Sequence, residues 1–201
     1  MIFVFLSMHF ACMQDYNGTV VGNPGSQSAA QVAPSTEVEY TSGRLYIESI
    51  SYLNEMDCPS EYSPSGDYCP DDFLVPVVEI VEQEINLLDP SDKFVLRNGE
   101  WTSVTLTLTE KPILIEGVGA AGNFQLSLDL EDLTLTSSDP YSLQGDFVLE
   151  LGRPDWLQGQ DLSDVEALTQ LVRSTSVWVK DFNGDGLVQD SERQSAVFVS
   201  E

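Results

Sequence analysis

Residues 103–109, Ser-Val-Thr-Leu-Thr-Leu-Thr, decide the fold because apolar and polar side chains alternate along them without interruption. Successive side chains of a strand point to opposite faces, so Val104, Leu106 and Leu108 would line a buried face and the hydroxyl residues an exposed one. The same period of two recurs over residues 124–130. Further apolar runs between turn-forming residues predict strands over residues 45–53, 75–88 and 147–151.

Turn chemistry separates these predicted strands. Turn-forming residues gather at 97–99, 117–122 and 137–140, and little helical spacing lies between the strands. Several strands with turns at short intervals predict a mainly β fold, an antiparallel β-sandwich over residues 37–152. Its shape would be immunoglobulin-like, although the Cys and Trp spacing of that fold is absent. An open barrel is the alternative.

One helix is predicted after the strands, within a C-terminal segment of residues 153–201 that packs on the sandwich. Ser163 and Glu166 have the spacing of a capping box, in which each side chain accepts a hydrogen bond from a free backbone N–H group of the first turn. One face of this helix would carry the apolar residues Leu162, Val165, Leu168, Leu171 and Val172.

The sharpest chemical signal is at residues 181–192, Asp-Phe-Asn-Gly-Asp-Gly-Leu-Val-Gln-Asp-Ser-Glu, which match the pattern D-x-[DN]-x-[DN]-G-x5-E at every position. Calcium takes about six to eight oxygen ligands, and a short loop supplies them when oxygen-bearing side chains alternate around a tight bend. Gly186 stands where the chain must turn sharply. The alternative is a solvated turn rich in Asp and Gly.

This stretch resembles the calcium loop of the EF-hand family, which implies Ca²⁺ as the cofactor. Residues 174–180, just before it, are β-branched and lack the apolar spacing of an entering helix. The closer resemblance is therefore to the single, helix-poor calcium loops of bacterial surface proteins. The metal ligands that the resemblance implies are Asp181, Asn183, Asp185, the backbone carbonyl of Leu187, Gln189, and Glu192 with both carboxylate oxygens.

The first twelve residues are nearly all apolar and end in Phe10-Ala11-Cys12. They resemble the signal of bacterial lipoproteins, in which a small residue precedes a cysteine that becomes acylated. The resemblance implies lipidation of Cys12 and a place in the bacterial cell envelope, at the outer membrane or in the periplasm, or outside the cell. A plain cleaved signal and a buried first strand are the alternatives. Residues 13–36, rich in Gly, Ser, Asn and Gln, predict a flexible linker.

The two remaining cysteines, Cys58 and Cys69, enclose a segment rich in turn formers. In an exported protein this arrangement predicts a disulfide. A metal-binding cysteine pair is the competing interpretation, but the close spacing of such pairs and a nearby histidine are both missing.

Composition restricts the function classes. A net charge of -25 and a pI near 4.1 exclude nucleic acid as a partner and leave a lipid anchor as the only membrane contact. The one histidine, His9, lies in the predicted signal, so the mature chain has no Ser-His-Asp or Cys-His arrangement. Hydrolysis by paired carboxylates remains as an alternative, with these candidates: Glu79, Glu82, Glu84, Asp129, Glu131 and Asp132.

We therefore expect an exported, lipid-anchored, non-catalytic protein in which Ca²⁺ stabilises the C-terminal segment. The alternative is a carbohydrate-binding or adhesive module with a glycan or protein ligand. Exposed aromatic rings would favour that alternative, and their burial would favour the first. The aromatic candidates are Trp101, Trp156, Trp178, Tyr46 and Tyr52.

Overall fold

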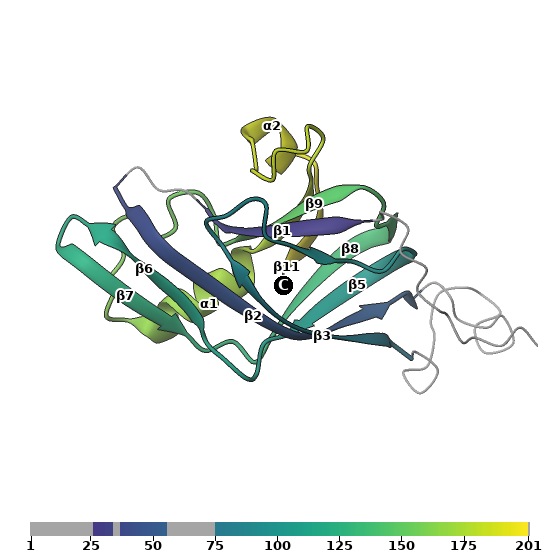
Figure 1. Cartoon of the computed structure of the whole chain (residues 1–201), viewed down its shortest axis with the longest axis horizontal. Helices are drawn as coiled ribbons and strands as arrows, with labels where there is room; N and C mark the ends of the chain where they lie inside the picture. Colours follow the sequence, from purple (N-terminus) through teal and green to yellow (C-terminus); the bar gives the residue numbers. More distant parts are fainter. Residues whose placement is uncertain (1–25, 34–36, 56–74, 201) are drawn as a thin grey trace, which may run out of the picture.

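The computed structural model describes residues 26–33, 37–55 and 75–200. They are mainly β, as the sequence predicts, and their strands curl into one sheet that two helices accompany (Figure 1). The strands are β1 Gln27–Val32, β2 Glu39–Leu53, β3 Val77–Asn86, β4 Lys93–Val95, β5 Glu100–Thr107, β6 Ile113–Gly119, β7 Gly122–Leu128, β8 Asp132–Ser142, β9 Asp146–Leu151, β10 Val177–Lys180 and β11 Ala196–Ser200. The helices are α1 Val165–Thr175 and α2 Asp190–Arg193. Cys12, Cys58 and Cys69 lie outside the described residues.

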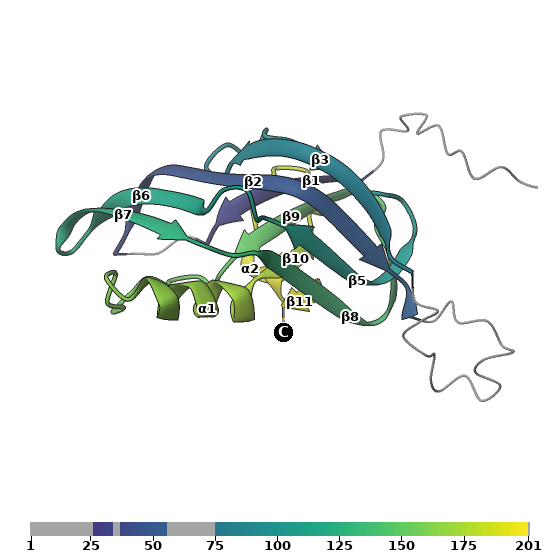
Figure 2. The same cartoon turned by 90° about the horizontal axis from the view of Figure 1, so that it is seen from below.

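The strands follow the order β4-β1-β9-β10-β11-β8-β5-β2-β6-β7, and β3 pairs with β2. They form one continuous hydrogen-bonded sheet where the sequence predicted a sandwich of two. The strand pairs between residues 37 and 152 are antiparallel, as predicted. Strand β1, which lies outside that range, runs parallel to β9, with Gln27 opposite Asp146 and Val32 opposite Leu151. Figure 2 shows how strongly β2 and β3 bend, which gives the sheet a concave side.

Strand β1 lies inside the segment that the sequence predicts to be a linker. Ala29, Ala30 and Ala33 are buried in it, and the Oγ atom of Ser28 accepts a 2.7 Å hydrogen bond from the indole Nε1 of Trp178. Small side chains let β1 pack closely against the indole ring, but they also keep the hydrophobicity of the segment low. Composition therefore suggested a linker where residues 27–32 are part of the sheet.

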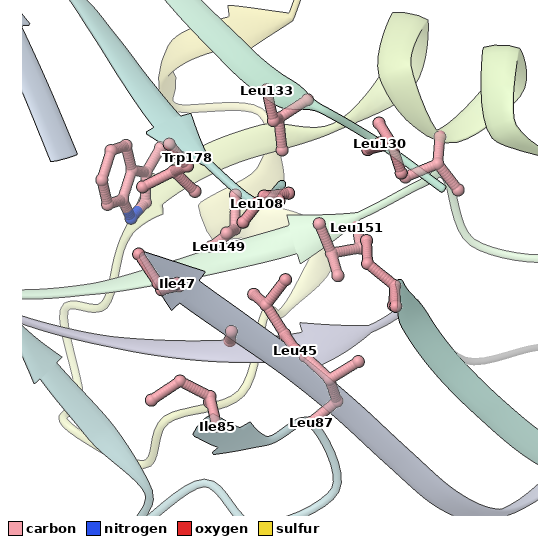
Figure 3. Close-up of a cluster of buried hydrophobic side chains, with 14 of the residues drawn as sticks. Leu45, Ile47, Ile85, Leu87, Leu108, Leu130, Leu133, Leu149, Leu151 and Trp178 are labelled. Carbon is pink, nitrogen blue, oxygen red and sulfur yellow. The ribbon is translucent and has the colours of Figure 1, made fainter. Parts of the chain in front are cut away.

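Buried apolar side chains from several strands form one core cluster, part of which is shown in Figure 3. Strands far apart in the sequence supply it: β2, β3, β9 and β10 all contribute fully buried side chains. Leu106 and Leu108 are also buried, which confirms the period-two prediction for residues 103–109. Burial of this apolar surface is the main force that holds the curled sheet together. The side chains labelled in Figure 3 are Leu45, Ile47, Ile85, Leu87, Leu108, Leu130, Leu133, Leu149, Leu151 and Trp178.

The predicted turn at residues 137–140 is wrong, because these residues belong to β8. Ser103 pairs with Thr136 and Trp101 with Tyr141, so residues 137–140 all stand opposite Thr102. The turn-forming residues thus make a large bulge inside a strand. A bulge leaves residues unpaired, which suits a proline that has no N–H group to donate.

Helix α1 begins later than the predicted capping box implies. Its N-cap is Asp164, whose carboxylate accepts a 3.1 Å hydrogen bond from the backbone N of Ala167. Ser163 instead donates through its N and Oγ atoms to Asp161, at 2.9 and 2.6 Å. The predicted apolar face is partly confirmed, since Leu168 and Val172 are buried while Val165 is 37% exposed. The helix lies against β7 and β11.

The C-terminal segment is an integral part of the sheet and not an appendage to it. Strands β10 and β11 lie between β9 and β8, near the middle of the strand order. The connection from β10 to β11 contains residues 181–195, and the sheet therefore holds both ends of this connection.

Neither of the described helices, α1 and α2, has the length and the apolar composition of a membrane-spanning helix.

Candidate metal centre

The loop of residues 181–192 leaves the sheet at the end of β10 and returns through α2, which projects from one side of the molecule (Figure 1). A strand precedes it in place of an entering helix, as the β-branched residues predict. The backbone N of Asp181 donates a 2.9 Å hydrogen bond to the carbonyl oxygen of Asp146 in β9. The first residue of the loop is therefore fixed to the sheet.

Asp181 organises the first half of the loop. Its Oδ1 atom accepts hydrogen bonds from the backbone N of Asn183, at 3.2 Å, and of Gly184, at 2.6 Å. Its Oδ2 atom accepts one from the backbone N of Gly186, at 2.8 Å. Gly184 and Gly186 have φ angles of +75° and +73°, in the left-handed region that glycine adopts without steric cost. The chain is thus wrapped around this carboxylate, which is only 6% exposed.

Gly186 also seats the loop on a neighbouring turn. A Cβ atom at this position would lie 2.7 Å from both the Cβ and the carbonyl oxygen of Pro90. Pro90 belongs to the turn of residues 89–92, which connects β3 with β4. Only glycine allows this close approach. The glycine that the loop pattern requires at its sixth position is therefore also needed for the loop to pack against this turn.

Glu192 joins the two ends of the loop. Its Oε1 atom accepts a 3.0 Å hydrogen bond from the backbone N of Phe182, and its Oε2 atom accepts one of 3.1 Å from the backbone N of Gln189. The side chain is 4% exposed, and Gln189 is the residue before α2 begins. The structure thus buries the first and the last of the six predicted ligands.

The middle ligands converge on Asp185. Its Oδ1 atom accepts the backbone N–H of Leu187 at 2.9 Å, and its Oδ2 atom accepts the side-chain amides of Asn183 and Gln189 at 3.0 and 3.2 Å. The hydrogen bond from Leu187 is the main cause that lowers the pKa of the Asp185 carboxyl. Three predicted ligand side chains therefore meet at one oxygen of an ionised carboxylate.

An ion pair that the sequence analysis did not single out ties this loop to the sheet. Arg193 donates through Nε and Nη2 to the two carboxylate oxygens of Glu150, at 2.8 and 2.7 Å, and through Nη1 to Asp190, at 2.7 Å. The hydrogen bond to Glu150 is the main cause that raises the pKa of Arg193. Glu150 is 1% exposed in β9. Glu150 is the one charged residue in the otherwise apolar run of residues 147–151, but this run does not indicate its distant partner.

The donor chemistry of the loop fits a hard cation. All six candidate ligands offer oxygen, and a carboxylate has about four lone-pair positions. Asp181 accepts three hydrogen bonds and Glu192 two, so both retain acceptor capacity. Among the described residues, no lysine or arginine forms an ion pair with Asp181, Asp185 or Glu192.

The side chains are not drawn together into one cluster. Within residues 26–33, 37–55 and 75–200, no group of three or more His, Cys, Asp or Glu side chains is arranged to hold a metal ion. The hydrogen bonds explain this, since Asp181 and Glu192 are turned to the backbone while Asp185 is turned to two side-chain amides. To bind an ion, Asn183 and Gln189 would have to turn their amides and present oxygen in place of nitrogen.

The other candidate residues are spread over the molecule. Glu79 pairs with Arg97 at 3.0 Å and Glu84 with Lys111 at 3.9 Å. The remaining acidic candidates for hydrolysis, Glu82, Asp129, Glu131 and Asp132, are exposed. The aromatic candidates are buried at Trp178, Trp156 and Tyr52 and half-buried at Trp101 and Tyr46.

No family model, curated protein or solved structure matches this chain. The chemistry and the geometry of the loop are therefore the features of the chain that indicate a function.

Proposed function

We propose that residues 181–192 bind a calcium ion, and that the ion stabilises the C-terminal segment of an exported, non-catalytic protein anchored by a lipid at Cys12. One observation carries the proposal: Asp181 and Glu192 are buried carboxylates with no cationic partner among the described residues. Buried charges in proteins are paired or coordinate metals, because a charge removed from water is otherwise costly. A cation between the two ends of the loop would supply the missing charge.

The roles of the ligands follow from the loop spacing. The side chains of Asp181, Asn183 and Asp185 would bind from the first half of the loop, and Gln189 would bind directly or through water. Glu192 would close the site with both carboxylate oxygens. The remaining ligand is the backbone carbonyl of Leu187.

A structural role fits the place of the loop. Asp181 is hydrogen-bonded to β9, and Glu192 is followed directly by Arg193, which is paired with Glu150 of the same strand. An ion that holds Asp181 and Glu192 together would lock β10 and α2 onto β9 and reduce fraying of the last strand. Outside the cell calcium is plentiful, so a dissociation constant on the order of 0.1 to 1 mM is sufficient.

Burial of the aromatic residues supports this proposal over a carbohydrate-binding module. Stacking on a sugar needs exposed rings, whereas Trp178 and Tyr52 are fully buried and Trp156 is 4% exposed. Trp101 packs on the core, and the half-buried ring of Tyr46 lies 4.3 Å from the Nζ atom of Lys111.

Thermal unfolding across a calcium titration tests the proposal, with magnesium as the control ion. Saturating calcium should stabilise the wild type by about 1.4 to 2.7 kcal/mol at about ten to a hundred times the dissociation constant. This corresponds to a rise in Tm of about 3 to 10 °C for a chain of this length. Magnesium should have little effect, because it prefers small octahedral sites that keep several waters.

Two variants distinguish ligand loss from loss of charge. Glu192→Gln should lose most of the calcium effect, because the residue that closes the site is neutralised. Asp190→Asn removes the same charge from a loop position that supplies no ligand, and it should respond as the wild type does. A Glu192→Gln variant that responds fully to calcium would contradict the site assignment.

A further inference from the structure

A pocket of about 310 Å³ lies beside β9, the end of α1 and the last strand. Arg153, Ser174, Val177, Arg193 and Ser200 are among its lining residues. Its volume is at the lower end of the range of about 300 to 1,000 Å³ that is typical of ligand sites. The size suits a small molecule and not a polymer.

The lining of this pocket is basic, whereas the chain as a whole is strongly acidic. The chain has 33 acidic and 8 basic residues, yet the lining contains two arginines and one acidic residue, Glu150. Arg193 satisfies both oxygens of Glu150. Arg153 is exposed and forms no ion pair within the described part of the chain. A second pocket shows the contrast, since its lining holds Glu37 and Asp161 and no basic residue.

The hydroxyl groups of the same lining are not available to a ligand. The Oγ atom of Ser200 is buried and makes no hydrogen bond to the described residues. Buried polar atoms are almost always hydrogen-bonded, and one left unpaired costs free energy. The hydroxyl of Ser176 donates to the carbonyl of Val172, and that of Thr175 to Leu171. Since Ser200 is shielded as well, recognition of a charged ligand group is left to Arg153.

The rest of the wall is apolar. Val177, Val199 and Pro154 contribute to the lining, and Val199 is 47% exposed. Apolar walls with a few placed polar groups are the usual composition of small-molecule sites. A ligand that fits has an anionic end and an apolar body.

We infer that this pocket binds a small organic carboxylate. Arg153 holds the carboxylate, and the apolar body packs on Val177 and Val199. The inference does not depend on the calcium proposal, because none of the loop residues 181–192 lines the pocket.

Titration with hexanoate, followed by the backbone amide NMR signals at a fixed calcium concentration, tests the inference. Saturable shifts should appear at Ser176, Val177 and Val199. For about eight non-hydrogen atoms of modest ligand efficiency, the Kd should be on the order of 1 mM. Hexanamide, which lacks the charge, and acetate, which lacks the apolar body, should each bind at least about tenfold more weakly.

A pair of arginine variants completes the test. Arg153→Ala should weaken hexanoate about tenfold, because a charged hydrogen bond is lost. Arg44→Ala is the matched control, since Arg44 is also exposed and without an ion pair among the described residues, but lies on β2 away from this pocket. Absence of saturable shifts, equal binding of hexanamide, or an equal loss in Arg44→Ala would each overturn the inference. A calcium titration in the absence of hexanoate tests the calcium site on its own, so failure of one proposal does not decide the other.

Discussion

Two Asp-rich turns of this protein use the same local chemistry in different surroundings. Asp89 accepts hydrogen bonds from the N and Oγ atoms of Ser91, at 2.9 and 2.6 Å, and its turn is exposed. Asp181 also accepts the N–H group two residues ahead, yet it is buried and lies in one loop with the buried Glu192. Local hydrogen bonds therefore do not distinguish a solvated turn from an ion site. What differs between them is that the loop buries two carboxylates for which the described residues offer no cationic partner, and this difference underlies the proposed ion site.

The largest loss of stability should come from breaking the ion pair that ties the loop to the sheet. Arg193→Ala leaves Glu150 buried and uncompensated, so we expect the free energy of unfolding to fall by about 3 to 5 kcal/mol in urea denaturation. Arg97→Ala is the control, since its pair with Glu79 is partly exposed and should cost at most about 1 kcal/mol. Equal losses in the two variants would show that the loop is not anchored through a buried pair.

A smaller loss of stability is expected when the contact between the loop of residues 181–192 and the turn of residues 89–92 is disturbed. Gly186→Ala places a Cβ atom against Pro90 in a left-handed backbone conformation, and should cost about 3 kcal/mol. Gly159→Ala is the matched control, because its φ of +71° is similar but no atom lies within 4 Å, and it should cost about 1 kcal/mol. Equal costs in urea denaturation would mean that the loop does not rest on the turn of residues 89–92.

The smallest effect on stability is expected from a change of pH. Hydrogen bonds from Leu187, Ser91 and Ser163 lower the pKa values of Asp185, Asp89 and Asp161 below those of the unfolded chain. The stability that these groups contribute is therefore present above the unfolded pKa of about 4 and is lost as pH falls through the lower folded values.

Urea midpoints measured from pH 7 to pH 3 in EDTA should accordingly fall below about pH 4. The fall should be slightly shallower in Asp185→Asn, which removes one of the three groups. A variant that follows the wild-type curve at every pH would contradict the role of Asp185.

Regular alternation made part of the fold predictable. Val104 and Leu106 alternate with polar residues and occupy the buried face of β5, as expected. Strand β1 was missed because its buried residues are mostly alanine and serine, which carry no hydrophobic signal. Residues 137–140 were misread because the same residue types form turns and bulges, and only the partner strand decides between them.

The loop was more predictable than its anchors. The spacing of Asp181, Gly186 and Glu192 predicted a tight bend with ligands at its ends, and the structure has that bend. The pairing of Glu150 with Arg193 spans 43 positions, so no local pattern could reveal it. Contacts of this kind depend on how the sheet folds and not on neighbouring residues.

Calorimetric titration of calcium tests the central claim most directly, with Asp181→Asn and Asp89→Asn measured beside the wild type. The two variants remove the same charge from the buried loop and from the exposed turn. We expect saturable binding at one site in the wild type and in Asp89→Asn, and its loss in Asp181→Asn. Wild-type binding in Asp181→Asn, or no calcium binding in any of the three proteins, would contradict the account.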